Sequence, residues 1–409
     1  MRGLITCLAF VVFFQFGAVG QSLPLNYDTL ELNQEFIVEG GGDFIGSAIQ
    51  RELSGKFLFG GYIDNSIKDN SYHRHSTINR IGTYGGVHFE YRNYKKKLIE
   101  NKNWGYLIKA GADVFGGGVY SKDLFGLVFY GNDPYKGETI DFSGSNFSFM
   151  SYQKLGFGMI DSKSKSAISI NLYNINSSLS ANFKSGEITQ DLNGDQLDFV
   201  LDGEVTLPTN GAFSQGVGIG LDFDFKLPVS IFKGQTSYIQ LQAKNIGIGY
   251  LHEKQKVYSI DTTLTFSGFQ FEQLIGTNAI FSDSLNVLDS LGINSVEKNN
   301  VVLLPGYFQV GKIVAKNTGK KLQSFYGVRI YPTLIFKPYV YAGVHYSLSK
   351  SICFGLNGGY GGFGKFRVGA YSSCNFGKYS VGVASENVLG FITKKASGQS
   401  LFIRLRCAI

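Results

Sequence analysis

Apolar residues recur at every second position through the C-terminal quarter of the chain, residues 338–409. Several such stretches of roughly ten residues follow one another with turn residues between them, which is typical of antiparallel strands that have two different faces. The last stretch places apolar residues on one face and Arg404 and Arg406 on the other. This distribution fits a barrel whose outer face contacts lipid and whose inner face contacts water.

The same period of two runs through most of the chain from Arg80 onward. Asn193-Gly194 predicts the turn of a hairpin over residues 187–201, and the apolar run Leu124–Tyr130 also predicts a strand that ends at a turn over residues 131–134. Together the stretches predict about fourteen spanning strands, with twelve or sixteen as alternatives, because single-chain bacterial barrels have even numbers of strands.

Two segments depart from this pattern. Residues 21–79 are less regular: Phe36, Val38 and the following glycines predict either a short first strand or a plug-like segment, and residues 50–61 are expected inside the lumen or at its rim. Apolar residues 281–291 recur at helical spacing among polar ones, which predicts one short amphipathic helix. We expect that helix to cover a barrel mouth, with a docking site for a partner as the alternative.

The N-terminus has the features of an export signal. A basic Arg2 precedes an apolar run over residues 4–16 and small residues before Gln21. The run is too short to span a bilayer. We therefore predict a signal peptide over residues 1–20, an N-terminal segment over residues 21–79 and a barrel over residues 80–409.

Composition narrows the class of protein. The chain has 409 residues, of which 17% are charged and 15% aromatic, with 53 glycines and 7 prolines. Soluble globular domains carry about 25% charged residues. Without an apolar helix to hold it in the inner membrane, an exported chain of this kind is predicted to reach the outer membrane. The net charge of +7 is scattered along the chain, which argues against nucleic-acid binding.

Charged residues inside the predicted strands are the candidate functional residues, because alternation assigns them to the inner face. Placing a basic residue toward lipid at the bilayer midplane would cost about 2–4 kcal/mol. They form either ion pairs that cross-link a plugged interior or a permeation path with a solute site. These lumen-facing candidates are Glu90, Arg92, Lys109, Asp113, Asp222, Asp224, Lys244, Arg329, Arg404 and Arg406.

One stretch partly matches a calcium-binding loop. Asp191, Asn193, Asp195 and Asp202 stand at the first, third, fifth and twelfth positions of the pattern. The glycine of the sixth position is absent, since Gln196 stands there, and a hairpin turn explains the local glycine without a metal. We therefore predict no metal, with these four residues as the calcium alternative.

No residues point to a cofactor or to catalysis. The glycines of residues 358–364 lack the lysine and the following helix of a phosphate-binding loop. His73 and His75 are two residues apart with no further ligand nearby in sequence, and a solvated loop explains them. The sequence predicts neither a cofactor nor an enzyme.

Several short motifs, taken in order, resemble an uncharacterised family of Bacteroidota-type outer-membrane barrels, which is similar in outline to the long-chain fatty-acid transporter barrels. The motifs occupy residues 59–64, 191–194, 304–306, 358–364 and 385–390. The resemblance implies a barrel of about fourteen strands and no catalytic residues. One departure is the C-terminal Ala408-Ile409, where such barrels commonly end in an aromatic residue.

These observations lead to two expectations for function. The first is an outer-membrane channel or transporter for small or apolar solutes; the alternative is a non-transporting barrel that scaffolds a secretion or surface-assembly complex. A soluble secreted β-sandwich adhesin is a third possibility. The expected partners are outer-membrane lipid, the barrel-assembly machinery during insertion, and secretion-system or surface proteins.

Overall fold

The structure is a computed structural model that describes residues 33–98, 103–232, 235–266, 295–315 and 320–409. The predicted signal peptide and the predicted helix over residues 281–291 lie outside these residues. Within them, no helix combines the length and the hydropathy that crossing a membrane requires.

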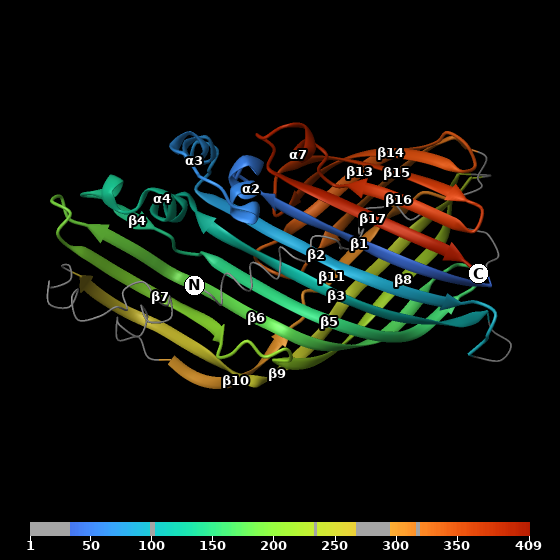
Figure 1. Cartoon of the computed structure of the whole chain (residues 1–409), viewed down its shortest axis with the longest axis horizontal. Coiled ribbons are helices and arrows are strands. Elements are labelled where there is room, and N and C mark those ends of the chain that lie inside the picture. The colour runs from blue at the N-terminus through green and yellow to red at the C-terminus, as the bar shows by residue number, and fades with distance from the viewer. Residues whose placement is uncertain (1–32, 99–102, 233–234, 267–294, 316–319) are drawn as a thin grey trace.

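Strands make up most of the structure (Figure 1). They are β1 (Gln34–Gly46), β2 (Ile78–Asn93), β3 (Trp104–Ser121), β4 (Thr139–Asp141), β5 (Asn146–Asp161), β6 (Ala167–Gln190), β7 (Leu197–Pro208), β8 (Gly216–Phe232), β9 (Gln235–Phe266), β10 (Ser295–Leu303), β11 (Tyr307–Ile313), β12 (Leu322–Ile330), β13 (Lys337–Ser347), β14 (Ile352–Gly362), β15 (Phe366–Phe376), β16 (Tyr379–Ser385) and β17 (Gly398–Ala408). The helices are α2 (Arg51–Phe59), α3 (Asn65–Tyr72), α4 (Lys122–Tyr130), the short 3-10 helix η1 (Asp133–Tyr135) and α7 (Leu389–Ile392).

The strands close into an antiparallel barrel of 14 strands, which confirms the predicted fold class and strand number. The circuit runs from β1 to β2, β3, β5, β6, β8, β9 and then β11 to β17 in order. The first and last strands pair to close it, with Glu39 opposite Arg404. At this seam the two backbones approach so closely that a Cβ on Gly41 would lie 2.0 Å from the carbonyl oxygen of Leu401. The N-terminal segment therefore contributes the first strand of the barrel.

Side chains alternate between the two faces of the wall. On β6, Ile170 and Leu172 are 57% and 61% exposed, whereas Asn171 between them is 0% exposed. The same alternation recurs around the barrel and gives an apolar outer surface, which matches the band of a membrane barrel. Other outward side chains include Phe89, Ile108, Phe157, Ile219, Val340, Leu356, Val383 and Ile403.

The two ends of the barrel differ in their connections. Short turns over residues 162–166, 348–351 and 377–378 join strands at one end, where β1 begins and β17 ends. Long connections over residues 47–77, 122–145 and 386–397 lie at the other end. We call these the short-turn end and the loop end. In bacterial outer-membrane barrels the short turns are periplasmic and the long loops extracellular.

Several strands continue past the barrel at the loop end. β6 and β9 span 24 and 32 residues, and their outer parts pair with β7, while β4 and β10 flank them. The hairpin predicted at Asn193-Gly194 is confirmed, because Gln190 pairs with Leu197 across that turn. We call this protruding sheet the extension sheet.

The prediction of a strand over Leu124–Tyr130 is wrong, because this segment is the helix α4. The hydroxyl of Ser121 accepts a hydrogen bond from the backbone N–H of Leu124 at 2.9 Å and so caps the helix N-terminus. Its buried side chain, Phe125, packs with residues of α2, α3 and β3. The local apolar run was therefore compatible with either element, and the cap and the tertiary contacts decide for the helix.

The helices pack against the outer side of the wall at the loop end. Their cluster, here called the rim cluster, includes Tyr120, whose position on β3 alternates with the lumen-facing Val119. The buried members of the rim cluster are Ile49, Leu53, Ile67, Tyr120 and Phe125. The residues predicted for the lumen or rim, 50–61, thus lie at the rim, on α2 and the segment after it.

The rim cluster carries one pH-sensitive group. His75 contacts the Ser71 carbonyl oxygen at 2.7 Å and the Tyr120 hydroxyl at 3.1 Å. Burial lowers the pKa of His75 from 6.5 to about 4. Between these two pH values the unfolded segment binds a proton that the folded segment does not, so the stability of the rim falls as pH falls.

We therefore expect amide protection factors in α3 to be lower at about pH 5 than at pH 7, measured by hydrogen exchange. In a His75→Gln variant the difference should disappear. An identical pH dependence in the variant would show that another group controls the rim.

Candidate functional site

The interior of the barrel divides into two regions, both built from inward-facing strand positions. Toward the short-turn end lies a charged space, here called the lumen cavity. Toward the loop end lies a set of packed rings and buried ion pairs, here called the lumen plug. The two regions lie at successive levels of the same strands: β1 contributes Glu35 and Glu39 to the cavity and Asp43 to the plug.

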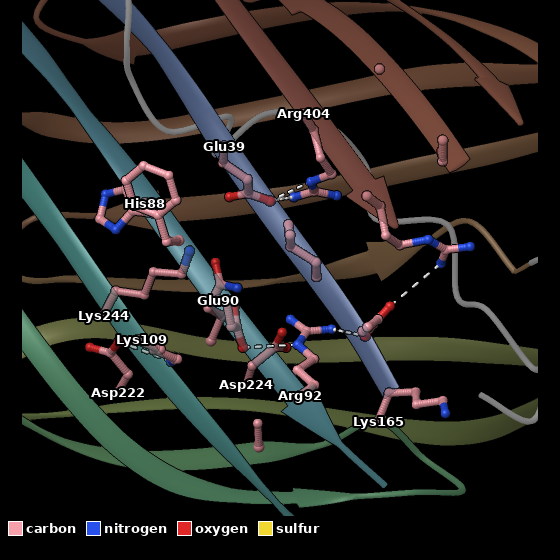
Figure 2. Close-up of a pocket in the computed structure, with 18 of the residues that line it drawn as sticks. Glu39, His88, Glu90, Arg92, Lys109, Lys165, Asp222, Asp224, Lys244 and Arg404 are labelled. Carbon is pink, nitrogen blue, oxygen red and sulfur yellow. Dashed lines mark hydrogen bonds and ion pairs between the residues drawn. The ribbon is translucent and has the colours of Figure 1, made fainter. Parts of the chain in front are cut away.

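The lumen cavity has a volume of about 170 Å³. Residues from β1, β2, β3, β8, β9 and β17 line it, and Figure 2 shows their side chains converging on one space. Among the described residues, its charged lining consists of the basic Arg92, Lys109, Lys154, Lys165, Lys226, Lys244, Arg404 and Arg406 and the acidic Glu35, Glu39, Glu90, Asp222 and Asp224. Basic side chains are therefore in excess.

Ion pairs tie the wall together on the β1 side of the cavity. Arg92 bridges Glu90 at 2.8 Å and Glu35 at 2.9 Å. Arg406 also approaches Glu35, at 3.8 Å, and Arg404 pairs with Glu39 across the seam of the barrel. The two C-terminal arginines thus reach carboxylates of the first strand, so these pairs reinforce the closure of the barrel.

A β-bulge shapes the opposite side of the cavity. The register between β8 and β9 shifts at Asp222, and Asn245 takes a left-handed conformation with φ of 55°. The backbone N–H of Asn245 donates to Asp222 at 2.8 Å, and Lys109 pairs with the same carboxylate at 3.2 Å. The side chain of Asn245 accepts from Lys154 at 2.9 Å. Bulges re-aim side chains, and this one lets the backbone and side chain of Asn245 bind two residues that line the cavity, Asp222 and Lys154.

Lys244 stands next to Asn245 in this bulge and differs from three other lysines of the cavity. Lys109, Lys154 and Lys226 each pair with an aspartate. Within the described residues the side chain of Lys244 forms no ion pair or hydrogen bond, and Figure 2 places it among the side chains of the cavity. Its ammonium group is therefore available to a solute.

The structure places all ten lumen-facing candidates inside the barrel. Asp113 contacts His88 at 2.9 Å and Lys154 at 3.5 Å, next to the cavity. Arg329 belongs to the plug, and the remaining eight line the cavity: Glu90, Arg92, Lys109, Asp222, Asp224, Lys244, Arg404 and Arg406.

Sequence reasoning missed the acidic partners Glu35, Glu39, Asp43 and Glu386. Glu35, Glu39 and Asp43 lie on β1, whose alternation with Phe36, Val38 and Phe44 was the available signal. Glu386 lies in a connection between strands, where period two gives no information.

The lumen plug contains a chain of buried ion pairs. Arg367 binds Asp43 and Glu386, each at 2.9 Å, and Arg329 binds the other oxygen of Glu386 at 3.1 Å. Arg367 also stacks on the ring of Tyr339, with 3.9 Å from the guanidinium carbon to the ring centroid. These residues come from β1, β12, β13, β15 and the connection before β17, so the network ties together strands from distant parts of the wall.

Aromatic rings close the lumen beside this network. Phe115 on β3 stacks with Tyr331, with ring centroids 5.1 Å apart, and its ring lies 5.8 Å from that of Phe363. Tyr331 and Phe336 belong to the connection between β12 and β13, and Phe363 belongs to the turn after β14. Since β3 and β12 lie on opposite sides of the circuit, these contacts cross the lumen.

The four residues of the calcium alternative do not come together. The carboxylate of Asp191 accepts hydrogen bonds from the backbone N–H groups of Asn193 and Gln196 at the hairpin tip. Asp202 lies further along β7, opposite Ser185 and beside Lys184. Across the described ranges, no group of three His, Cys, Asp or Glu side chains is arranged to hold a metal ion.

Comparison with known proteins finds similarity to solved structures only. No family model and no curated protein matches the chain. The Pseudomonas putida toluene transporter TodX is similar over 93% of this chain and 91% of its own, with 9% identity and a TM-score of 0.39. The translocator domain of the autotransporter NalP from Neisseria meningitidis is similar over 94% and 91%, with 9% identity and a TM-score of 0.29.

Because these sequence identities and TM-scores are low, the class of this protein is assigned from the geometry of its own chain. A closed wall with an apolar outer face and a charged interior defines a transmembrane β-barrel of the outer-membrane class.

Proposed function

We propose that the protein is an outer-membrane transport barrel for small solutes, apolar ones included, in which the lumen cavity receives the solute and the lumen plug is the gate. The observation that carries this proposal is the charged cavity inside a closed barrel, with Lys244, which has no partner among the described residues, in its wall. A barrel that served only as a scaffold would need no such space. Two further features support the proposal. The plug lies at the next level of the same strands as the cavity, and three of its rings come from connections between strands.

The plug is suited to gating because it draws on connections. Tyr331, Phe336 and Phe363 lie outside the strands, so they can leave the lumen without breaking the hydrogen bonds of the wall. A ring contact of this kind is worth about 0.5–1.5 kcal/mol beyond the area it buries.

Solute flux tests the proposed function directly. The full chain, reconstituted in liposomes, is expected to admit small solutes faster than empty liposomes do in a swelling assay. Flux should rise further when the plug is opened by mutation. Liposomes that remain impermeable with both the wild-type protein and a plug-opened variant would overturn the proposal.

Lys244 is expected to influence which ions pass. A unit charge about 6 Å from a permeating ion changes its energy by about 0.7 kcal/mol in water, or about threefold in relative permeability. Lys244→Gln should therefore raise the permeability of cations relative to anions about threefold. The change is measured as a shift of the reversal potential under a salt gradient. Lys350→Gln, in an exposed turn at the short-turn end, is the control, and equal shifts in both would exclude a specific role for Lys244.

The extension sheet supports a second candidate function, the assembly of a secretion or surface complex. Its strand β10 pairs with β9, and its Val301 and Leu303 are 69% and 74% exposed. An exposed strand with apolar side chains is a common site for adding a strand from a partner. Crosslinking on cells that captures a second protein through β10, together with absence of solute flux, would favour this candidate.

We further propose export through the signal peptide over residues 1–20, insertion by the barrel-assembly machinery, membership of the Bacteroidota-type family and the absence of enzymatic activity. The apolar run near the N-terminus supports export through a signal peptide. The closed antiparallel wall supports insertion by the barrel-assembly machinery, and the ordered motifs support membership of the family. Peptide sequencing of the exported protein should begin at Gln21.

A further inference from the structure

A second cavity lies on the outside of the barrel wall at the loop end, between α2 and the connection that leads from α7 to β17. Its volume is about 270 Å³. We call it the headgroup groove, and it is lined by Phe44, Arg51, Glu52, Ser54, Gly55, Lys56, Lys394 and Gln399.

The groove faces the lipid. Phe44 alternates on β1 with Asp43 and Ile45, whose side chains belong to the lumen plug. Gln399 lies on the same face of β17 as Leu401, which is 44% exposed. The groove therefore opens at the upper border of the apolar band, at the level where lipid headgroups meet the protein.

Backbone hydrogen bonds build the groove. The N–H of Arg51 donates to the carbonyl oxygen of Ala396 at 2.7 Å, and the N–H of Glu52 donates to that of Lys394 at 3.2 Å. The guanidinium of Arg51 also donates to the side-chain oxygen of Gln399 at 3.2 Å. The start of α2 is thus held against the connection before β17, and the hydrogen bond to Gln399 fixes the side chain of Arg51.

Two of the three basic groups in the groove lack an acidic partner among the residues that the structure describes. Lys394 pairs with Glu52 at 2.9 Å. Arg51 and Lys56 have no such pair within the described ranges, and the only carboxylate in the lining is the one that Lys394 occupies. Lys56 also interacts electrostatically with the exposed Asp64, outside the lining. With three basic groups against one carboxylate, the lining itself carries a net charge of +2 (3 − 1), which an anionic group of a lipid at headgroup level would complement.

The wall below the groove is suited to acyl chains. Gly42 stands on the outward face of β1 below Phe44, and a Cβ placed there would meet nothing nearer than the Tyr84 carbonyl oxygen at 3.8 Å. Packing therefore does not require glycine, and its effect is a shallow furrow in the apolar wall. At the start of β17, where α7 packs, Phe391 and Ile392 are 55% and 76% exposed.

We propose that the headgroup groove binds a phosphorylated lipid of the outer leaflet. Arg51 and Lys56 contact the phosphate, and an acyl chain lies along the furrow over Gly42. Arg51 supplies paired N–H donors that match phosphate oxygens, whereas Lys56 supplies a mobile point charge. The site is separate from the lumen, so it does not depend on the proposed transport.

The test uses the full chain extracted from vesicles of phosphatidylcholine that contain either lipid A or dephosphorylated lipid A, with bound lipid counted by native mass spectrometry. Wild-type protein is expected to retain lipid A. The amount of lipid A retained by the Arg51→Gln/Lys56→Gln variant should be at least about tenfold lower than with the wild type, because two basic contacts are lost. The matched control Lys350→Gln/Lys378→Gln removes two exposed charges at the short-turn end and should behave as wild type.

Three results would overturn the proposal. They are equal retention by the groove variant and the control, equal retention of the dephosphorylated lipid, and full displacement of lipid A by inorganic phosphate, which would indicate a site for the free ion. Heat-modifiable gel mobility confirms that each variant is folded. The single variant Lys56→Gln, which alters only an accessible lysine, provides a second measurement with an intermediate loss.

Discussion

Replacing Glu386 with glutamine is expected to destabilise the barrel by about 3–5 kcal/mol, the usual cost of leaving buried charges without their partner. Glu386 is the shared anion of Arg329 and Arg367, which bind its two oxygens at 3.1 and 2.9 Å. Glutamine keeps the shape of the side chain, so the loss is electrostatic. After substitution Arg367 retains Asp43, but Arg329 loses its carboxylate. Urea unfolding in phospholipid vesicles measures the effect.

The matched control is Glu297→Gln on β10. Glu297 pairs with Lys254 at 3.7 Å, and their side chains are 48% and 62% exposed. Exposed pairs contribute about 0–1 kcal/mol, so this variant should unfold almost as wild type does. If both variants unfold at the same urea concentration, the network in the lumen plug does not hold the strands together.

Removing the ring contact across the lumen is expected to open the barrel. In a Phe115→Ala/Tyr331→Ala variant, single-channel recordings in planar bilayers should show a clear rise in conductance over wild type, because these rings join β3 to the connection after β12 at 5.1 Å. Each truncation also removes buried apolar surface. The loss of the phenylalanine ring alone should lower the free energy of unfolding by about 3–5 kcal/mol. Measurements below the lowered unfolding temperature therefore separate opening from loss of structure.

Phe157→Ala is the control for that experiment. Phe157 is 55% exposed on the lipid side of β5, so its truncation removes a ring of the same kind without touching the lumen. Conductance should stay at the wild-type level. A closed double variant would show that the buried ion pairs alone, or other parts of the chain, block the path.

Period two was sufficient to predict the barrel, because lipid on one side and water on the other impose opposite demands on neighbouring residues. The strand number also needed the rule that such barrels have even numbers of strands, and the predicted strands included the segment that forms α4. The same rule assigned Arg404 and Arg406 to the inner face, where the structure shows them beside Glu39 and Glu35. Where a residue stands in a regular strand between two solvents, its direction can be read from sequence.

The helix α4, the role of Glu386 and the rings of the lumen plug depend on tertiary contacts, which the sequence does not show. The apolar run of α4 has no period-two polar face, and its helical state follows from the Ser121 cap and from packing on α2 and α3. Glu386 lies in a connection, and three of the rings that close the lumen, Tyr331, Phe336 and Phe363, come from connections that fold inward. Such placements depend on which strands are neighbours in the closed wall, so they appear only in three dimensions.

Pairing β1 with β17 has a consequence for biogenesis. Before β17 (Gly398–Ala408) pairs with β1, the wall has two edges with unpaired main-chain groups, one on each of these two strands. Main-chain groups on such edges cannot be left bare in hydrocarbon and invite pairing with foreign chains. Both edges are therefore removed at one seam, where β1 pairs with β17 and Arg404 meets Glu39.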